Sequence, residues 1–289
     1  MSEVASAGKI QSKKMRIWAI VLSVVVFLCV AFAAVAGIAT GVADRWRPWR
    51  PDYERLTDDE IYKILRKKTL SDEDYRVLYA QTGLTKIGID GLIEREQKWK
   101  IVQIANDYFA DYKMVRERIA PFTCWEKIGH IVTLCAVEPG DILVTNSTHV
   151  ASFRYGHAAI VLSEYEIAEA YGLGSRSDLS PIALFQDYAS FMLLRPKVDE
   201  RIKVQVAEYT RGHLINIPYR LTLGVFSKKY ETGGATSTQC AHLVWDAYKR
   251  FGIDLDSNGG RIIKPQDIAN SEHVEVVQIY GFHPDKLWK

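Results

Sequence analysis

The longest run of apolar positions lies near the N-terminus. Residues 17–43 contain no charged side chain, and a helix of this length can cross a bilayer, which needs about 20 residues. The rival interpretation is a secretory signal, because Ala34-Val35-Ala36 resembles a cleavage site. The apolar core of a signal is only about 7–15 residues long. We therefore expect a transmembrane anchor over residues 17–43, or an uncleaved signal, rather than a segment that is removed.

Basic residues on the two sides of this segment bear on its orientation, because cytoplasmic flanks carry an excess of Lys and Arg. Four precede the segment and three follow it: Lys9, Lys13, Lys14 and Arg16, then Arg45, Arg47 and Arg50. This small excess predicts a cytoplasmic tail over residues 1–16 and a single-pass protein of the cell membrane, with residues 44–289 outside. Trp18, Trp46 and Trp49 stand where interfacial aromatics are expected.

Residues 44–120 have the pattern of a helical region. It opens with a stiff, proline-containing linker at 45–52, and the helical pattern follows. Thr57 to Glu60 and Ser71 to Asp74 each carry the helix-start signature in which two side chains cap the first turn. Residues 81–84 interrupt the pattern, and we expect helix again through about Arg118. The apolar stripe of that last helix is Ile101, Ile104, Ala105, Tyr108 and Phe109.

At Pro121 the pattern changes to short apolar runs that are typical of strands. The runs lie at 141–144, 158–162, 166–170, 191–194 and 274–280, with a turn-rich stretch at 172–180. Helical patterns at 200–211 and 239–251 separate the later runs. Strands that are mostly joined by hairpins and packed on helices predict an α+β domain over residues 121–289.

Composition and charge narrow the function classes. The net charge is only +2 and the charged fraction is 25%, so no nucleic-acid partner is expected. Cys29 lies in the apolar segment, whereas Cys124 and Cys135 either pair in an oxidising compartment or stay buried free thiols. The spacing of Cys and His predicts no structural zinc site, and we expect no cofactor.

Cys240, at the predicted start of a helix, is the candidate nucleophile. The partial positive charge and free amides of a helix start favour the thiolate form of a cysteine and can stabilise an oxyanion. His157 begins a strand upstream and can supply the base. Glu169 lies on the next predicted strand, where a hairpin would place it beside His157 to orient the ring, as the third member of a triad does.

Each of these residues also has a purely structural interpretation. Cys240 alone can be a small buried side chain. His157 alone can be a histidine at a strand end whose ring nitrogens are hydrogen-bonded, and Glu169 can be a surface carboxylate. The three together are a far more specific signal of a catalytic site than any one of them. His149 is a second candidate base, but its polar turn predicts a surface or substrate-facing position. His242, two positions after Cys240, should point to another face of the helix.

The order of several motifs resembles the permuted papain-like branch of the NlpC-type cysteine hydrolases, which includes the YiiX-like amidases and the lecithin:retinol acyltransferase-like proteins. The motifs are Gly-Asp-Ile-Leu (140–143), Gly-His-Ala-Ala-Ile-Val (156–161), Glu169-Ala170, Gln239-Cys240-Ala241-His242-Leu243-Val244-Trp245 and Lys264-Pro265-Gln266-Asp267-Ile268. The resemblance covers about residues 137–280. It implies a permuted papain-like domain, in which an antiparallel sheet packs on helices.

The resemblance also implies roles for single residues. Cys240 would be the nucleophile, His157 the general base and Glu169 the third polar group. Tyr219 and Gln239 would bind substrate, and a packing role for Tyr219 is the alternative. Ala241 stands where relatives usually have Ser, but the backbone amide there, and not the side chain, would serve the oxyanion.

We therefore expect a membrane-anchored cysteine hydrolase that cleaves an amide bond, with cell-wall peptide as the substrate class. Two alternatives stay open. One is a lipid-directed thiol acyltransferase or esterase, for which a membrane anchor is also suitable. The other is a non-catalytic binding module, against which the intact Cys, His and Glu argue. The fold resemblance alone does not decide between them.

Overall fold

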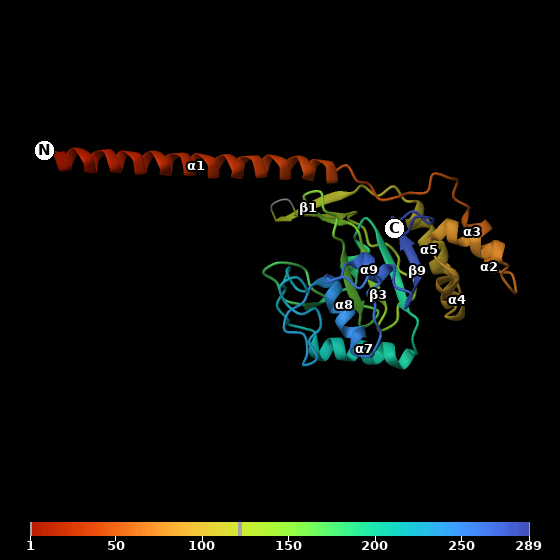
Figure 1. Cartoon of the computed structure of the whole chain (residues 1–289). Helices are drawn as coiled ribbons and strands as arrows, with labels where there is room; N and C mark the ends of the chain where they lie inside the picture. The colour runs from red at the N-terminus through yellow and green to blue at the C-terminus, as the bar shows by residue number, and fades with distance from the viewer. Residues whose placement is uncertain (1, 121–122, 289) are drawn as a thin grey trace. The chain divides into compact units, whose positions relative to one another are not determined.

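The computed structural model describes residues 2–120 and 123–288, and Figure 1 shows the course of the chain. It is a mixed structure of helices and antiparallel sheets, as the sequence predicts. By contacts, the chain divides into two compact units. One comprises the residues up to 46 together with 150–153, and the other comprises 47–149 and 154–289. We call the second the globular unit.

The N-terminal unit is dominated by one long helix, α1 (Ser2–Ala43). Its part from Met15 to Ala43 is long and apolar enough to cross a membrane, although a signal sequence meets the same criterion. The expected span of 17–43 lies inside this part. Most of its large apolar side chains are exposed, because α1 has no protein core around it.

Four short helices open the globular unit: α2 (Asp58–Leu65), α3 (Asp72–Thr82), α4 (Lys86–Glu94) and α5 (Lys98–Phe109). Both predicted capping boxes are confirmed, because Thr57 caps α2 with Glu60 and Ser71 caps α3 with Asp74. Gly83 ends α3 in the left-handed conformation, which confirms the predicted interruption. The stripe predicted on α5 is buried except for Phe109, which is half-buried.

The prediction of helix through Arg118 is wrong. Glu96, between α4 and α5, has a left-handed φ of 58° that breaks the helix, and α5 ends at Phe109. The chain then forms β1 (Val115–Ala120), which pairs antiparallel with β2 (Thr123–Lys127). With β4 (Thr148–Val150) they form a three-stranded sheet in the order β1-β2-β4. The position at which we expect the helical pattern to give way to strands, Pro121, lies outside the described residues.

The main sheet has six antiparallel strands in the order β7-β6-β5-β3-β8-β9. They are β3 (Ile142–Thr145), β5 (His157–Val161), β6 (Glu166–Glu169), β7 (Asp178–Pro181), β8 (Phe191–Pro196) and β9 (Val274–Tyr280). Five of these strands match predicted runs. The edge strand β7 was not predicted, because it overlaps the stretch at 172–180 whose sequence is typical of turns. Every residue of β3 and β5 is buried, so the core surrounds these two central strands.

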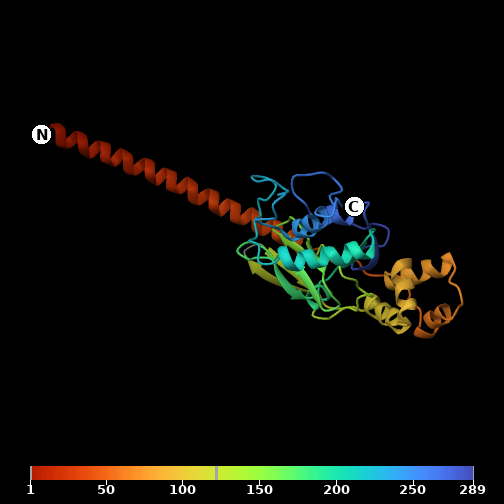
Figure 2. The ribbon, with the colours of Figure 1, turned by 90° about the horizontal axis from the view of Figure 1, so that it is seen from below.

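Helices α6 (Ala183–Gln186), α7 (Glu200–His213), α8 (Cys240–Lys249) and α9 (Pro265–Ala269) complete the globular unit. Helix α8 packs on β5 and on α7, and α9 packs on α8 and β3. Figure 2 shows α7, drawn in blue-green, crossing over the strands. All residues of α8 from Cys240 to Tyr248 are buried. This helix, which the pattern at 239–251 predicts, is therefore covered on all sides along these residues.

Trp49, one of the aromatics expected near a membrane interface, packs against other rings. Its ring lies 5.8 Å from that of Tyr108 on α5 and 5.4 Å from that of His283. Its backbone amide donates to the Gly281 carbonyl. From Arg47 onward, the chain therefore belongs to the globular unit, and the prolines of the expected linker lead into a packed segment.

Gly156, directly before β5, shows why the sequence needs glycine there. Its φ is +76°, a conformation that other residues rarely adopt. A Cβ at this position would lie 2.6 Å from the Thr145 carbonyl oxygen and 2.7 Å from the Trp288 ring. The chain can therefore turn tightly into β5 only because the side chain is absent, and this turn sets the start of the strand at His157.

Gly156→Ala should destabilise the globular unit more than Gly129→Ala. Gly129 has a similar φ of +65°, but nothing lies within 4 Å of its Cβ position. The control should lose about 1–2 kcal/mol of the free energy of unfolding from backbone strain. Gly156→Ala should lose about 1–3 kcal/mol more because of the clash. Urea unfolding measures both, and equal losses would contradict the close approach.

Candidate active site

Cys240 is the first residue of α8. Gln239, the residue before the helix, has extended backbone angles and makes no side-chain cap. The first amides of a helix have no partner within the helix, so the amides beside the thiol are not occupied by a capping side chain. Cys240 itself is buried, with 7% of its surface exposed. The predicted placement of the cysteine at a helix start is confirmed.

His157 and Glu169 come together through the β5–β6 hairpin. Glu169 pairs in register with Ala159, two residues along β5 from His157. Because alternate residues of a strand face the same side, the side chains of His157 and Glu169 meet. His157 Nε2 lies 2.7 Å from Glu169 Oε2, and both side chains are almost fully buried. The sequence prediction of this pair is confirmed in its geometry.

The imidazole of His157 also interacts with the Cys240 thiol. Burial opposes the charged form of the ring, but hydrogen bonding to Cys240 and to Glu169 outweighs this cost and raises the pKa of His157 to about 10. Since Nε2 is bonded to Glu169, Nδ1 is the nitrogen left for the sulfur. The carboxylate is therefore hydrogen-bonded to the imidazole, and the thiol lies near enough to the ring to affect its pKa.

Glu169 stays ionised in this environment. Burial alone would raise the pKa of its carboxyl group, but the hydrogen bond from His157, with help from Ser180 and Tyr171, lowers the pKa below its ordinary value. The attraction between the charged forms of the two side chains contributes to both the raised pKa of the imidazole and the lowered pKa of the carboxyl group. Both shifts favour the imidazolium–carboxylate form of the pair.

Aromatic rings form a wall around the imidazole that the sequence analysis missed. Phe185 and Tyr171 stack on His157, with ring centroids at 5.6 and 6.0 Å, and Tyr188 lies at 6.4 Å. Trp125 of the small sheet stacks on Tyr171 at 5.4 Å. The wall fixes the plane of the ring. It comes from separate segments, so no local pattern indicates it.

Tyr155 is a further residue of the site that the sequence analysis missed. Burial raises the pKa of its phenol, the Trp125 side chain opposes this, and the neighbouring Cys240 raises it further. No local pattern indicates this residue, because the left-handed Gly156 interrupts the extended chain between Tyr155 and His157.

The two residues predicted to bind substrate lie next to the nucleophile. Burial, and then the nearby Cys240, raise the pKa of Tyr219, which forms a parallel bridge with Thr238. Gln239 instead turns its side-chain amide toward the loop before α8, where it donates to the Leu221 carbonyl at 2.9 Å. Tyr219 is half-buried and so can contact a ligand, whereas the Gln239 amide holds a loop.

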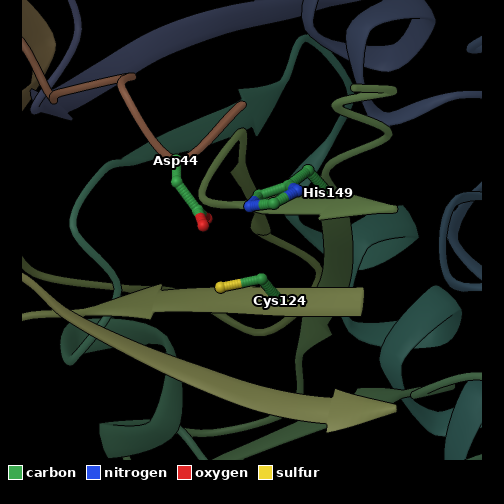
Figure 3. A group of neighbouring side chains, drawn as sticks. All are labelled: Asp44, Cys124 and His149. Atoms are coloured by element: carbon green, nitrogen blue, oxygen red, sulfur yellow. The ribbon is translucent and has the colours of Figure 1, made fainter. Parts of the chain in front are cut away.

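His149 does not occupy the predicted surface position. It is completely buried on β4, with Nε2 3.8 Å from Oε1 of Glu126, which also pairs with Arg154. The polar turn that precedes it leads into a buried strand, and no local pattern shows this. Figure 3 shows His149 and Cys124 on neighbouring strands of the small sheet.

The ligand atoms of Cys124 and His149 lie within 4.8 Å of one another. Asp44, also drawn in Figure 3, belongs to the N-terminal unit. The globular unit therefore supplies two potential ligands here, fewer than the three or four that zinc sites in proteins use. This proximity is therefore not sufficient evidence for a metal site. The expected absence of a structural zinc site stays a prediction.

His242 points away from the nucleophile, as its position in the helix predicts. Its Nε2 lies 2.7 Å from the Lys229 carbonyl oxygen and its Nδ1 3.2 Å from Thr238 Oγ1. Both ring nitrogens are thus occupied. Of the two interpretations of Cys124 and Cys135, the structure has buried free thiols.

Comparisons with known proteins leave the family open. No protein-family model matches the chain, and no solved structure matches it. Among curated proteins, the chain is similar to the uncharacterized protein YycO of Bacillus subtilis (strain 168), with 26% identity over 140 residues. The match covers 48% of this chain and 54% of YycO, so the chain spans about half the length of that relative. The name of YycO states no activity.

Glu169→Gln should lower the pKa of His157, because the substitution removes the negative charge that favours the imidazolium. An opposite charge at this distance shifts a pKa by about 1–3 pH units. Histidine NMR of the full-length protein in detergent, followed against pH, measures the change. The imidazolium should then lose its proton at a lower pH than in the unaltered protein.

Glu166→Gln is the matched control, because Glu166 lies on the same strand but pairs with Arg211. Its substitution should leave the His157 titration unchanged. If Glu169→Gln had no more effect than Glu166→Gln, the carboxylate would not be what holds the imidazole charged.

Proposed function

We propose that this chain is a membrane-anchored cysteine hydrolase that cleaves an amide bond. The observation that carries the proposal is the buried hydrogen bond between His157 and Glu169, with Cys240 at the start of α8 near enough to the imidazole to affect its pKa. A thiol at a helix start, an imidazole beside it and a carboxylate on the far ring nitrogen are what nucleophilic catalysis by cysteine requires. The permuted papain-like fold is part of the same proposal, supported by the order of the histidine strand before the cysteine helix.

In the first half of the reaction, the Cys240 thiolate attacks the carbonyl carbon of the amide. The oxygen becomes an oxyanion, which the free amides at the start of α8 stabilise. The C–N bond then breaks as His157 gives its proton to the leaving amine. The product is a thioester of Cys240 with the acyl part of the substrate.

In the second half, neutral His157 takes a proton from water, and the resulting hydroxide attacks the thioester carbonyl. The C–S bond breaks, the acid leaves, and the thiolate–imidazolium pair is restored. Glu169 accepts from Nε2 throughout, so the ring keeps Nδ1 toward the sulfur. It acts on orientation and charge and does not touch the substrate.

Cell-wall peptide is the proposed substrate class, and α1 the proposed membrane anchor. The resemblance of the motifs to the NlpC-type hydrolases supports the substrate. The length and apolar character of α1, with slightly more basic residues before it than after it, support an anchor that holds the globular unit outside the cell membrane. A peptide of the wall would be within reach there.

Cys240→Ala should abolish turnover of cell-wall peptides by the full-length protein, with a loss on the order of 10⁴-fold or more. The small buried substitution should leave the fold intact. Cys135→Ala is the matched control, because Cys135 is also a buried thiol but burial raises its pKa to about 11, and it should keep full activity. Mass spectrometry of the released fragments measures both.

The same assay includes fatty-acyl esters beside the peptides. Faster cleavage of the esters would replace the amide hydrolase with the lipid-directed alternative. Cleavage of neither substrate by the unaltered protein would favour the binding module. Peptide cleavage that survives in Cys240→Ala would remove the nucleophile assignment.

A further inference from the structure

The loop before α8 exposes large apolar side chains to solvent. Phe226 is 85% exposed, Leu221 56% and Val225 40%. Ile262, on a second segment, is 38% exposed. Single exposed apolar residues are ordinary, but a group of them on one surface marks a site of interaction.

The two segments pack together. Gly224 has a φ of +83°, and a Cβ there would lie 1.8 Å from the Arg261 carbonyl oxygen, so the loop lies directly against residues 261–262. The Lys229 ammonium also donates to the Gly260 carbonyl at 2.8 Å. Residues 220–228 and 258–264 therefore form one surface, which we call the basic apolar surface.

Positive charge surrounds the apolar side chains. The exposed basic residues of the two segments are Arg220, Lys228, Arg261 and Lys264. Neither segment contains an acidic residue. Two carboxylates lie nearby: Asp256 is paired with Lys229, and Asp267 accepts from the Lys264 amide and the Asn258 side chain. The surface thus combines protruding apolar groups with an excess of positive charge.

We propose that the basic apolar surface binds an anionic phospholipid membrane. Apolar side chains that enter the boundary between headgroups and acyl chains, with Lys and Arg held at the negative headgroups, are the two contributions that bind a protein to such an interface. The proposed anchor α1 also argues for a bilayer as the occupant, because it keeps the globular unit beside one. A protein partner would have to supply both an apolar face and acidic groups.

The surface is connected to the nucleophile by short links. Besides the Gln239 contact with Leu221, the Arg220 amide donates to the Thr238 carbonyl at 2.9 Å. Membrane contact would thus hold the loop beside Cys240 and select substrates at the bilayer surface. This consequence rests on the proposed function, whereas the membrane contact itself does not.

Hydrogen exchange of the full-length chain in nanodiscs tests the contact. The Cys240→Ala protein is used, so that the result does not depend on thiol chemistry. Amide exchange of residues 220–228 and 258–264 should slow about threefold or more in discs with 30% anionic phosphatidylglycerol, relative to discs of phosphatidylcholine alone. Phe226→Ser and, separately, Lys228→Gln should each reduce the slowing.

Tyr165→Ser is the matched control, because Tyr165 is 78% exposed in the turn between β5 and β6, outside the basic apolar surface. It should leave the slowing intact. Exchange that is the same in both kinds of disc, or slowing that persists in both variants, would overturn the proposal. Either result would favour a protein or polymer partner as the occupant of the basic apolar surface.

Discussion

The hydrogen bond between His157 and Glu169 is the interaction on which the rest of the site depends. Both side chains are buried at the ends of their strands, His157 at the start of β5 and Glu169 at the end of β6. An unpaired charge is costly in a buried position, so each requires the other. The β5–β6 hairpin supplies the register, Gly156 sets where β5 begins, and the aromatic wall fixes the ring plane. Helix α8, packed on β5, then brings the thiol near the imidazole. The strand pairing thus determines the geometry of the site.

Much of this arrangement follows from local sequence. The capping boxes at Thr57 and Ser71 and the strand at His157 each depend on residues a few positions apart, and the sequence analysis predicted them. The His157–Glu169 pair was also predictable, since a hairpin joins adjacent strands. The placement of Cys240 was predictable as a helix start, but its proximity to His157, across more than eighty residues, was supported only by the resemblance of the motifs.

The failures share a physical reason, which is that distant partners decide the structure. Strand β1 was mistaken for helix, because its pairing with β2 outweighs its local pattern, and the left-handed Glu96 had no sequence signal. His149 is buried by its place on β4 beside Glu126. The exposed loop before α8 was not singled out, because exposure is visible only once the core is known.

The most direct test of the central claim is the alkylation rate of Cys240 by iodoacetamide at pH 7, in the full-length protein and in His157→Ala, read by mass spectrometry. Cys135, whose pKa burial raises to about 11, is the internal reference and should stay nearly unreacted. A working thiolate–imidazolium pair predicts fast alkylation of Cys240 and a rate at least about tenfold lower in His157→Ala. Equal rates in the two proteins would contradict the account, because the imidazole would then do nothing for the thiol.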